Sequence, residues 1–283
     1  MATRAPAQSM RCCVGLIACM TFAAGITGCG GTSQNPTPVQ LPTSITGNWE
    51  LTANVTPGGT APIAVYLTSD AGSVSGIAYG PAATDNVCVA NGCCGSPIGI
   101  FSGVVLSGTI DASGNLKLGT AAGGVPAFAM TGTVGGSTIS SGSFTLQCSN
   151  VATAQGTITG VEFPPLGGTY SGTLTSQVTG QSFTMAMALN QSSGPNSNGD
   201  LNLAGTVDVS GYSYISPTAM SLPAGFTFVG NAFYVDVDSS SGEALYLTAT
   251  LSPDGKTLQV TYGTFPSGGG LTQDYGTGTL TLQ

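Results

Sequence analysis

In the stretch Phe233-Tyr234-Val235-Asp236-Val237-Asp238, apolar and polar side chains alternate strictly. Successive side chains of a β-strand point to opposite faces, so this stretch predicts a strand with one apolar face to bury. The same alternation recurs at Ile63, Val65 and Leu67, and at Phe183, Met185, Met187 and Leu189. No stretch after residue 44 has the 3.6-residue period of an amphipathic helix. The chain of 283 residues is therefore predicted to be all-β.

The segments between these runs carry turn signals. Gly, Asn, Asp, Ser and Pro gather at residues 111–115, 196–200 and 252–256. Short strands joined by such turns form an antiparallel meander, which folds into a sandwich or a barrel.

The two halves of the body resemble each other, which predicts two tandem, related meander units. The first opens with Gly47-Asn48-Trp49-Glu50-Leu51-Thr52 and the second with Gly168-Thr169-Tyr170-Ser171-Gly172-Thr173. A hairpin at residues 106–118 resembles one at 247–260, and the closing segments 144–147 and 280–283 resemble each other. We place unit 1 at residues 45–160 and unit 2 at residues 161–283, with a joint at Phe163-Pro164-Pro165-Leu166. One continuous large sandwich or barrel is the alternative.

The opening Gly47-Asn48-Trp49, followed by an up-and-down meander, resembles the lipocalin and avidin superfamily. Tyr170 takes the position of the tryptophan in the second half. The resemblance implies a barrel in each half, with Trp49 closing the floor of the first.

The N-terminal 28 residues predict an export signal. Arg4 and Arg11 precede an apolar stretch at residues 12–26, which is too short to span a bilayer comfortably. The next residues, Ile26-Thr27-Gly28-Cys29, resemble the lipobox of bacterial lipoproteins. That resemblance implies cleavage before Cys29, a diacylglycerol on its thiol and an acylated amine. Gly30 in place of Asp favours the outer membrane over the inner one, if the source has both.

Residues 29–44 are then the lipidated cysteine and a flexible tether rich in Pro, Ser, Thr and Gly. About 15 flexible residues span roughly 20 Å, so the folded body is expected close to a membrane surface.

The remainder of the chain is acidic. From residue 29 on it contains no His or Arg. It has two lysines, Lys117 and Lys256, and 12 carboxylates, which gives a formal charge of −10. A protein with so few cations cannot neutralise phosphates, so nucleic acid is excluded as a partner. The membrane contact is expected through the lipid.

Four cysteines remain after the signal and Cys29: Cys88, Cys93, Cys94 and Cys148. An even number in an oxidising compartment predicts two disulfides. We expect one bridge within residues 88–94 and one from that segment to Cys148, with a metal site as the alternative.

Catalysis is not expected, because the mature chain lacks the histidine that most nucleophilic sites need. A carboxylate-based hydrolase, for example one acting on glycans, is the alternative. Asp236 and Asp238 share a strand face about 7 Å apart, but such a hydrolase needs acids converging from different strands. Asp236, Asp238 and Glu243 also suggest a Ca²⁺ loop, although Gly242 and Glu243 come too early in the pattern. No cofactor is expected.

Four aromatic residues mark a candidate binding surface: Tyr212, Tyr214, Phe226 and Phe228. Capping of the core by these side chains is the alternative. The predicted function is a non-enzymatic, lipid-anchored binding or structural protein of the cell envelope. Its partner is expected to be a small apolar ligand, a glycan or an envelope protein. A pocket lined by Phe183, Met185 and Met187 would indicate a ligand carrier, and a filled core a scaffold.

Overall fold

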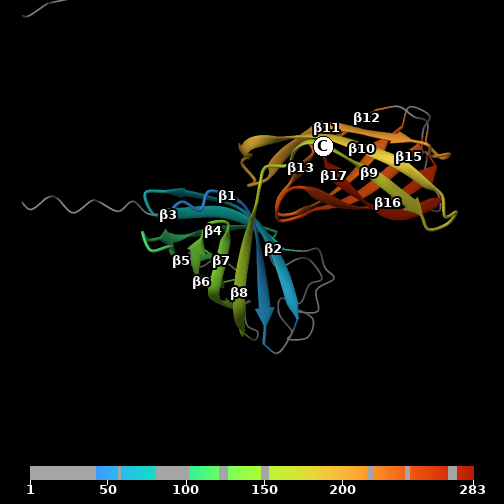
Figure 1. Ribbon diagram of the computed structural model, residues 1–283. Coiled ribbons are helices and arrows are strands. Elements are labelled where there is room, and N and C mark those ends of the chain that lie inside the picture. Colours follow the sequence, from blue (N-terminus) through green and yellow to red (C-terminus); the bar gives the residue numbers. More distant parts are fainter. Residues whose placement is uncertain are drawn as a thin grey trace, which may run out of the picture. The chain divides into compact units, whose positions relative to one another are not determined.

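A computed structural model describes residues 43–56, 59–80, 102–120, 127–147, 153–215, 219–239, 243–266 and 273–283. The chain divides into residues 1–39 and a compact unit at 40–283, and all described residues belong to the latter. The described residues form β-strands and turns, with no helix among them (Figure 1). The all-β prediction is confirmed.

The first eight strands form a closed antiparallel barrel, in which each strand pairs with its neighbour in sequence and β8 pairs with β1. The strands are β1 (Gly47–Val55), β2 (Thr60–Asp70), β3 (Ser73–Tyr79), β4 (Ser102–Ile110), β5 (Asn115–Thr120), β6 (Ala127–Gly135), β7 (Thr138–Gln147) and β8 (Thr153–Phe163).

The remaining strands form a second barrel-like sheet. They are β9 (Gly167–Ser176), β10 (Ser182–Pro195), β11 (Leu201–Ser210), β12 (Met220–Ser221), β13 (Thr227–Phe228), β14 (Ala232–Asp238), β15 (Glu243–Leu251), β16 (Thr257–Pro266) and β17 (Asp274–Leu282). Strands β12 and β13 both pair with β11 and together occupy one interrupted strand position. Strand β17 returns to pair with β9. The prediction of two tandem barrel-like units is confirmed, and the single continuous sheet is wrong, because the described strands of the two sheets do not pair with each other.

The strands of the two barrels correspond in order. Strands β1 and β9 begin 120 residues apart, at 47 and 167, and β6 and β15 begin 116 apart, at 127 and 243. Strands β8 and β17 begin 121 apart, at 153 and 274. The predicted equivalence of the hairpins at 106–118 and 247–260 is therefore wrong: they hold the fourth and fifth positions in one barrel and the sixth and seventh in the other. Every hairpin needs alternating side chains around a turn that often contains Gly. This pattern therefore does not show which strands of a barrel a hairpin forms.

The strands of the two barrels meet at the predicted joint, Phe163-Pro164-Pro165-Leu166, shortly after the boundary drawn at residue 160. Strand β8 continues to Phe163, which pairs with Asn48, and β9 begins at Gly167. Phe163 and Leu166 pack in the core of the second barrel. Asn48 also exchanges two hydrogen bonds with the backbone of Gly230, donating from Nδ2 at 2.7 Å and accepting at Oδ1 at 2.8 Å.

One end of the first barrel is closed by Trp49 and the segment that precedes it. Trp49 is buried at the start of β1, and its Nε1 donates a hydrogen bond to the carbonyl oxygen of Ile45 at 3.0 Å. Ile45 is itself buried, and its backbone N–H donates a hydrogen bond to Ser69 Oγ at 3.0 Å. Tyr170 occupies the same place in the second barrel, where its hydroxyl donates to the carbonyl of Gly255 at 2.8 Å. The equivalence predicted between Trp49 and Tyr170 is thus matched by their positions.

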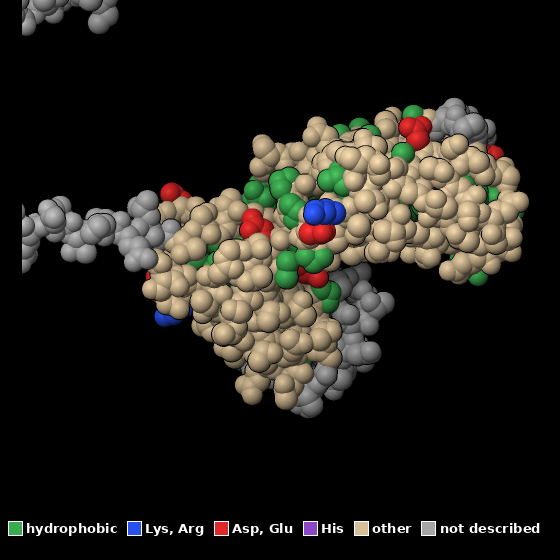
Figure 2. All heavy atoms as spheres, in the orientation of Figure 1, with side chains coloured by type: hydrophobic (Ala, Val, Ile, Leu, Met, Phe, Trp, Pro, Cys, Tyr) green, Lys and Arg blue, Asp and Glu red, His purple; other side chains and the backbone are tan. Residues whose placement is uncertain are grey.

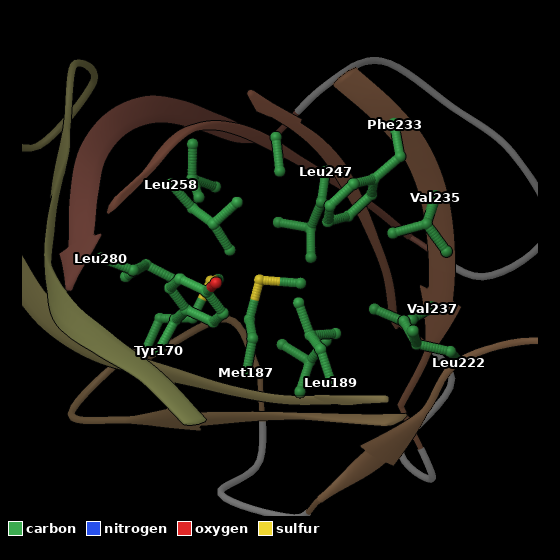
Figure 3. Close-up of a cluster of buried hydrophobic side chains, with 14 of the residues drawn as sticks. Tyr170, Met187, Leu189, Leu222, Phe233, Val235, Val237, Leu247, Leu258 and Leu280 are labelled. Carbon is green, nitrogen blue, oxygen red and sulfur yellow. The ribbon is translucent and has the colours of Figure 1, made fainter. Parts of the chain in front are cut away.

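Inward-facing side chains fill the middle of both barrels. In the second, residues from opposite walls converge on one cluster, with Met187 near its centre (Figure 3). Met185, Met187, Leu247 and Leu280 have 0% exposure, as do Leu51, Val65, Leu106 and Ile158 in the first barrel. A cavity that holds even one water molecule leaves accessible surface on the side chains lining it. Eight strands enclose a space that side chains can fill, and these eight central residues leave no water-sized space against their own side chains.

Candidate functional site

A buried carboxylate is the most unusual polar group among the described residues. Asp274, at the start of β17, has 0% exposure inside the second barrel. Its Oδ1 accepts hydrogen bonds from Ser176 Oγ at 2.6 Å and from the Tyr275 N–H at 2.8 Å. Its Oδ2 accepts from the hydroxyls of Tyr212 at 2.7 Å and Tyr262 at 3.0 Å. We call Ser176, Tyr212, Tyr262 and Asp274 the polar cluster.

The hydrogen bonds decide the charge state of the cluster. Burial alone raises the pKa of Asp274, but the donors Ser176, Tyr212 and Tyr262 outweigh it, and the pKa lies below its usual value. Burial, together with the hydrogen bond to Asp274, raises the pKa of Tyr262 to about 12 and also raises that of Tyr212. At neutral pH the cluster therefore holds one carboxylate and two neutral phenols.

The polar cluster has little capacity for chemistry. A carboxylate offers about four lone-pair sites, and here four protein donors occupy them. Phe183 covers Tyr212 as well, with the two rings stacked at 4.1 Å. A general base needs an accessible lone pair and a pKa near the working pH, and Asp274 has neither. The arrangement instead ties together β9, β16, β17 and the segment after β11.

The first barrel carries apolar residues at the equivalent positions, which the strand register identifies. Gly276 pairs with Ser176 and Tyr262, and Gly156 pairs with Val55 and Phe144. Likewise Asp274 pairs with Thr264, and Ala154 pairs with Leu146. The four residues Val55, Phe144, Leu146 and Ala154 are all buried. One barrel thus closes this end with a hydrogen-bonded network and the other with apolar side chains.

The four predicted aromatic residues are distributed over two opposite ends of the second barrel. Tyr212 is buried in the polar cluster, and Tyr214 lies against it with ring centroids 5.5 Å apart. Phe226 and Phe228 both pack edge-to-face on Phe233 at the other end, at 6.0 and 6.1 Å. Tyr214 and Phe226 are partly buried and contact the core. The four do not form one surface, and their placement is that of core-capping residues.

The predicted acidic candidates lie apart from the polar cluster. Asp236 and Asp238 share the exposed outer face of β14, as the alternation predicts. The Oε2 of Glu243 accepts a hydrogen bond from Ser239 Oγ at 3.0 Å in the turn between β14 and β15. Within the described residues, no three His, Cys, Asp or Glu side chains gather to hold a metal ion. Cys29 and the four disulfide candidates Cys88, Cys93, Cys94 and Cys148 lie outside the described residues.

Exposed aromatic rings occur instead on the outer face of β14 to β17. Tyr234 and Tyr275 are 57% and 50% exposed. The ring of Tyr246 lies between those of Tyr234, at 6.2 Å, and Phe265, at 4.5 Å. Partial burial and the neighbouring carboxylate of Asp236 raise the pKa of Tyr234 to about 12. We call Tyr234, Tyr246, Phe265 and Tyr275 the aromatic face. In the sequence, Tyr234 belongs to the polar, outward-facing positions of the alternating stretch at 233–238, as Asp236 does.

Charged side chains are sparse on the side of the molecule seen in Figure 2. Figure 2 shows a face on which uncharged side chains and backbone predominate among scattered acidic groups. Across the described residues, no helix is long and apolar enough to cross a membrane.

Comparison with known proteins adds little to this geometry. No protein-family model matches the chain, and no curated protein matches it. Among solved structures, it is similar to the crystal structure of a protein of unknown function from the DUF3598 family of Nostoc punctiforme PCC 73102. The sequences are 9% identical, the match covers 84% of this chain and 96% of the other, and the TM-score is 0.26. The function must therefore be inferred from this chain's own residues.

Proposed function

We propose that this protein is exported, is anchored to the cell envelope by lipid on Cys29, and acts there without catalysis. In this proposal its two barrels are a stable scaffold that binds partners through outer surfaces. The lipobox, the short tether and the shortage of basic residues support the anchor, since lipid must then supply the membrane contact.

The observation that carries the scaffold role is the complete burial of central side chains in both barrels. A carrier of a small apolar ligand needs an enclosed cavity of several hundred Å³. The central residues Met185, Met187 and Leu247 instead have 0% exposure, so they contact one another and leave no such space among themselves. This favours binding outside the barrels over the predicted alternative of ligand carriage.

The hydrolase alternative receives less support from the described carboxylates. Asp274 is enclosed and fully hydrogen-bonded, and Asp236 and Asp238 stand on one exposed strand. A glycosidase places two carboxyl groups on either side of the scissile bond. Neither Asp274 nor the pair Asp236 and Asp238 provides this arrangement.

Two measurements test the proposal. Mass spectrometry of the protein purified from membranes should find an N-terminal acylated Cys29, and Cys29→Ser should release the chain to the soluble fraction. Organic extraction of the same sample should yield no stoichiometric small molecule beyond the acyl chains. An intact segment 1–28, or one extracted ligand per chain, would contradict the anchor or the scaffold role respectively.

A further inference from the structure

The aromatic face has a regular layout on the outside of the second barrel. Asp236 pairs with Tyr246, Tyr246 with Gly263, and Gly263 with Tyr275, so these four residues form one row across β14 to β17. Gly263 contributes no side chain, so the row has a shallow floor between two tyrosines. Tyr246 and Tyr275 are two strands apart, which is about 10 Å.

The ring of Tyr246 is held in position before any partner arrives. Phe265 meets it edge-on, with 74° between the ring planes, and Tyr234 flanks its other side. Rings already fixed in place lose little conformational entropy on binding.

These groups match the chemistry of a sugar chain. A pyranose ring has an apolar C–H face that stacks on an aromatic ring, and hydroxyl groups at its edge that donate to a carboxylate. The row supplies the half-buried ring of Tyr246 and the exposed ring of Tyr275, separated by a glycine floor, with Asp236 at one end. Thr248 and Thr261, which pair with each other on the same outer face, add hydroxyl groups.

The charge of the region selects among partners. Asp236 and Asp238 are exposed on the same face, so a polyanion would be repelled. A second copy of the chain is disfavoured by the same groups, because an isologous contact would bring one acidic face against another. An uncharged polymer is repelled by neither of these electrostatic effects.

We propose that the aromatic face of the second barrel binds an uncharged polysaccharide, with Tyr246 and Tyr275 stacking on its sugar rings and Asp236 accepting from its hydroxyls. The proposal rests on the proposed role of the outer surface in binding. It is independent of the lipid on Cys29, so its failure would leave the anchor and the filled barrels standing.

The test is affinity electrophoresis of the mature chain in native gels containing hydroxyethylcellulose, galactomannan or glycogen, with alginate as the polyanion. At least one uncharged polymer should retard the protein. Tyr246→Ala and Tyr275→Ala should each weaken that retardation at least tenfold, and Tyr275→Trp should retain it. Val105→Ala, at a side chain 58% exposed on the first barrel, is the matched control and should change nothing.

Thermal unfolding of each variant must match the parent, so that loss of binding reports the surface and not the fold. The proposal is overturned if none of the three uncharged polymers retards the protein, or if retardation persists in both alanine variants. It is also overturned if alginate alone retards the protein, or if sedimentation shows that the face joins two copies of the chain.

Discussion

At the scale of single residues, Asp274 illustrates how a buried charge can be tolerated and why its removal is costly. Asp274→Asn would keep the shape but replace two acceptor sites with donors, which leaves hydroxyls of the polar cluster without partners. We expect a loss of about 2–4 kcal/mol in the free energy of unfolding at pH 7. Denaturant unfolding measures it, with the exposed Asp236→Asn expected to change stability by less than about 0.5 kcal/mol.

The pH dependence of Asp274 follows from its lowered pKa. A carboxyl group whose pKa is lower in the folded state contributes stability above its unfolded pKa, about 3.9, and loses it as the pH falls through the folded value. The parent should therefore lose more stability than Asp274→Asn on acidification below about pH 4. Equal acid sensitivity of the two proteins would contradict the role assigned to this carboxylate.

Glu50 should change the stability with pH in the opposite direction from Asp274. Burial raises its pKa, and the hydrogen bond from the Asn231 backbone lowers it by less. The contribution of Glu50 to folding stability is fully present below its pKa in the unfolded chain, about 4.3. It is lost as the pH rises through the pKa of Glu50 in the folded protein. Glu50→Gln should raise the melting temperature at pH 7, and the gain should vanish below about pH 4. Asp70→Asn, at an exposed carboxylate ending β2, is the matched control.

At the scale of strands, a glycine under an aromatic ring recurs in both barrels. A Cβ at Gly276 would lie 2.0 Å from the Thr175 carbonyl oxygen and 2.8 Å from the Tyr262 ring, and Gly156 has the same relation to Asn54 and Phe144. Gly276→Ala should therefore cost about 1–3 kcal/mol. Gly135→Ala, where a Cβ meets nothing within 4 Å, should leave stability unchanged or raise it by up to about 1 kcal/mol. Chemical unfolding of both variants checks the difference, and equal effects would refute it.

The strands could be predicted because their alternation is local, whereas their order and the polar cluster could not. The alternation of residues 233–238 is visible in sequence, and β14 follows it. Any hairpin alternates around its turn, so the hairpin at 106–118 resembled one that lies two strand positions later in the second barrel. Asp274 lies in a Gln-Asp-Tyr-Gly segment that reads as a turn, and its burial depends on Ser176, 98 residues away. Contacts over such distances leave no periodic signal.

For the whole molecule, the order and direction of the strands bear on the predicted disulfides. Strands alternate in direction, so the β3–β4 and β7–β8 connections leave the same end of the first barrel. Cys88, Cys93 and Cys94 lie in the first connection and Cys148 in the second. We expect peptide mapping without reductant to find a bridge between Cys148 and residues 88–94. Four free thiols after extraction from membranes would rule this out.

The two barrels share the residues at their joint, so a cut in the chain cannot leave both complete. Val161, Glu162 and Phe163 pair with Glu50, Trp49 and Asn48 to close the first barrel, while Phe163 and Leu166 pack in the second core. We therefore expect overlapping fragments 43–163 and 161–283 to unfold cooperatively. Fragment 43–160 should melt at a lower temperature than 43–163, because it leaves Trp49 without its β8 partner. Both fragments of this pair lack the Asn48–Gly230 hydrogen bonds, so the comparison isolates the end of β8. Circular dichroism provides the melting curves, and identical curves would show that β8 closes the barrel without these three residues.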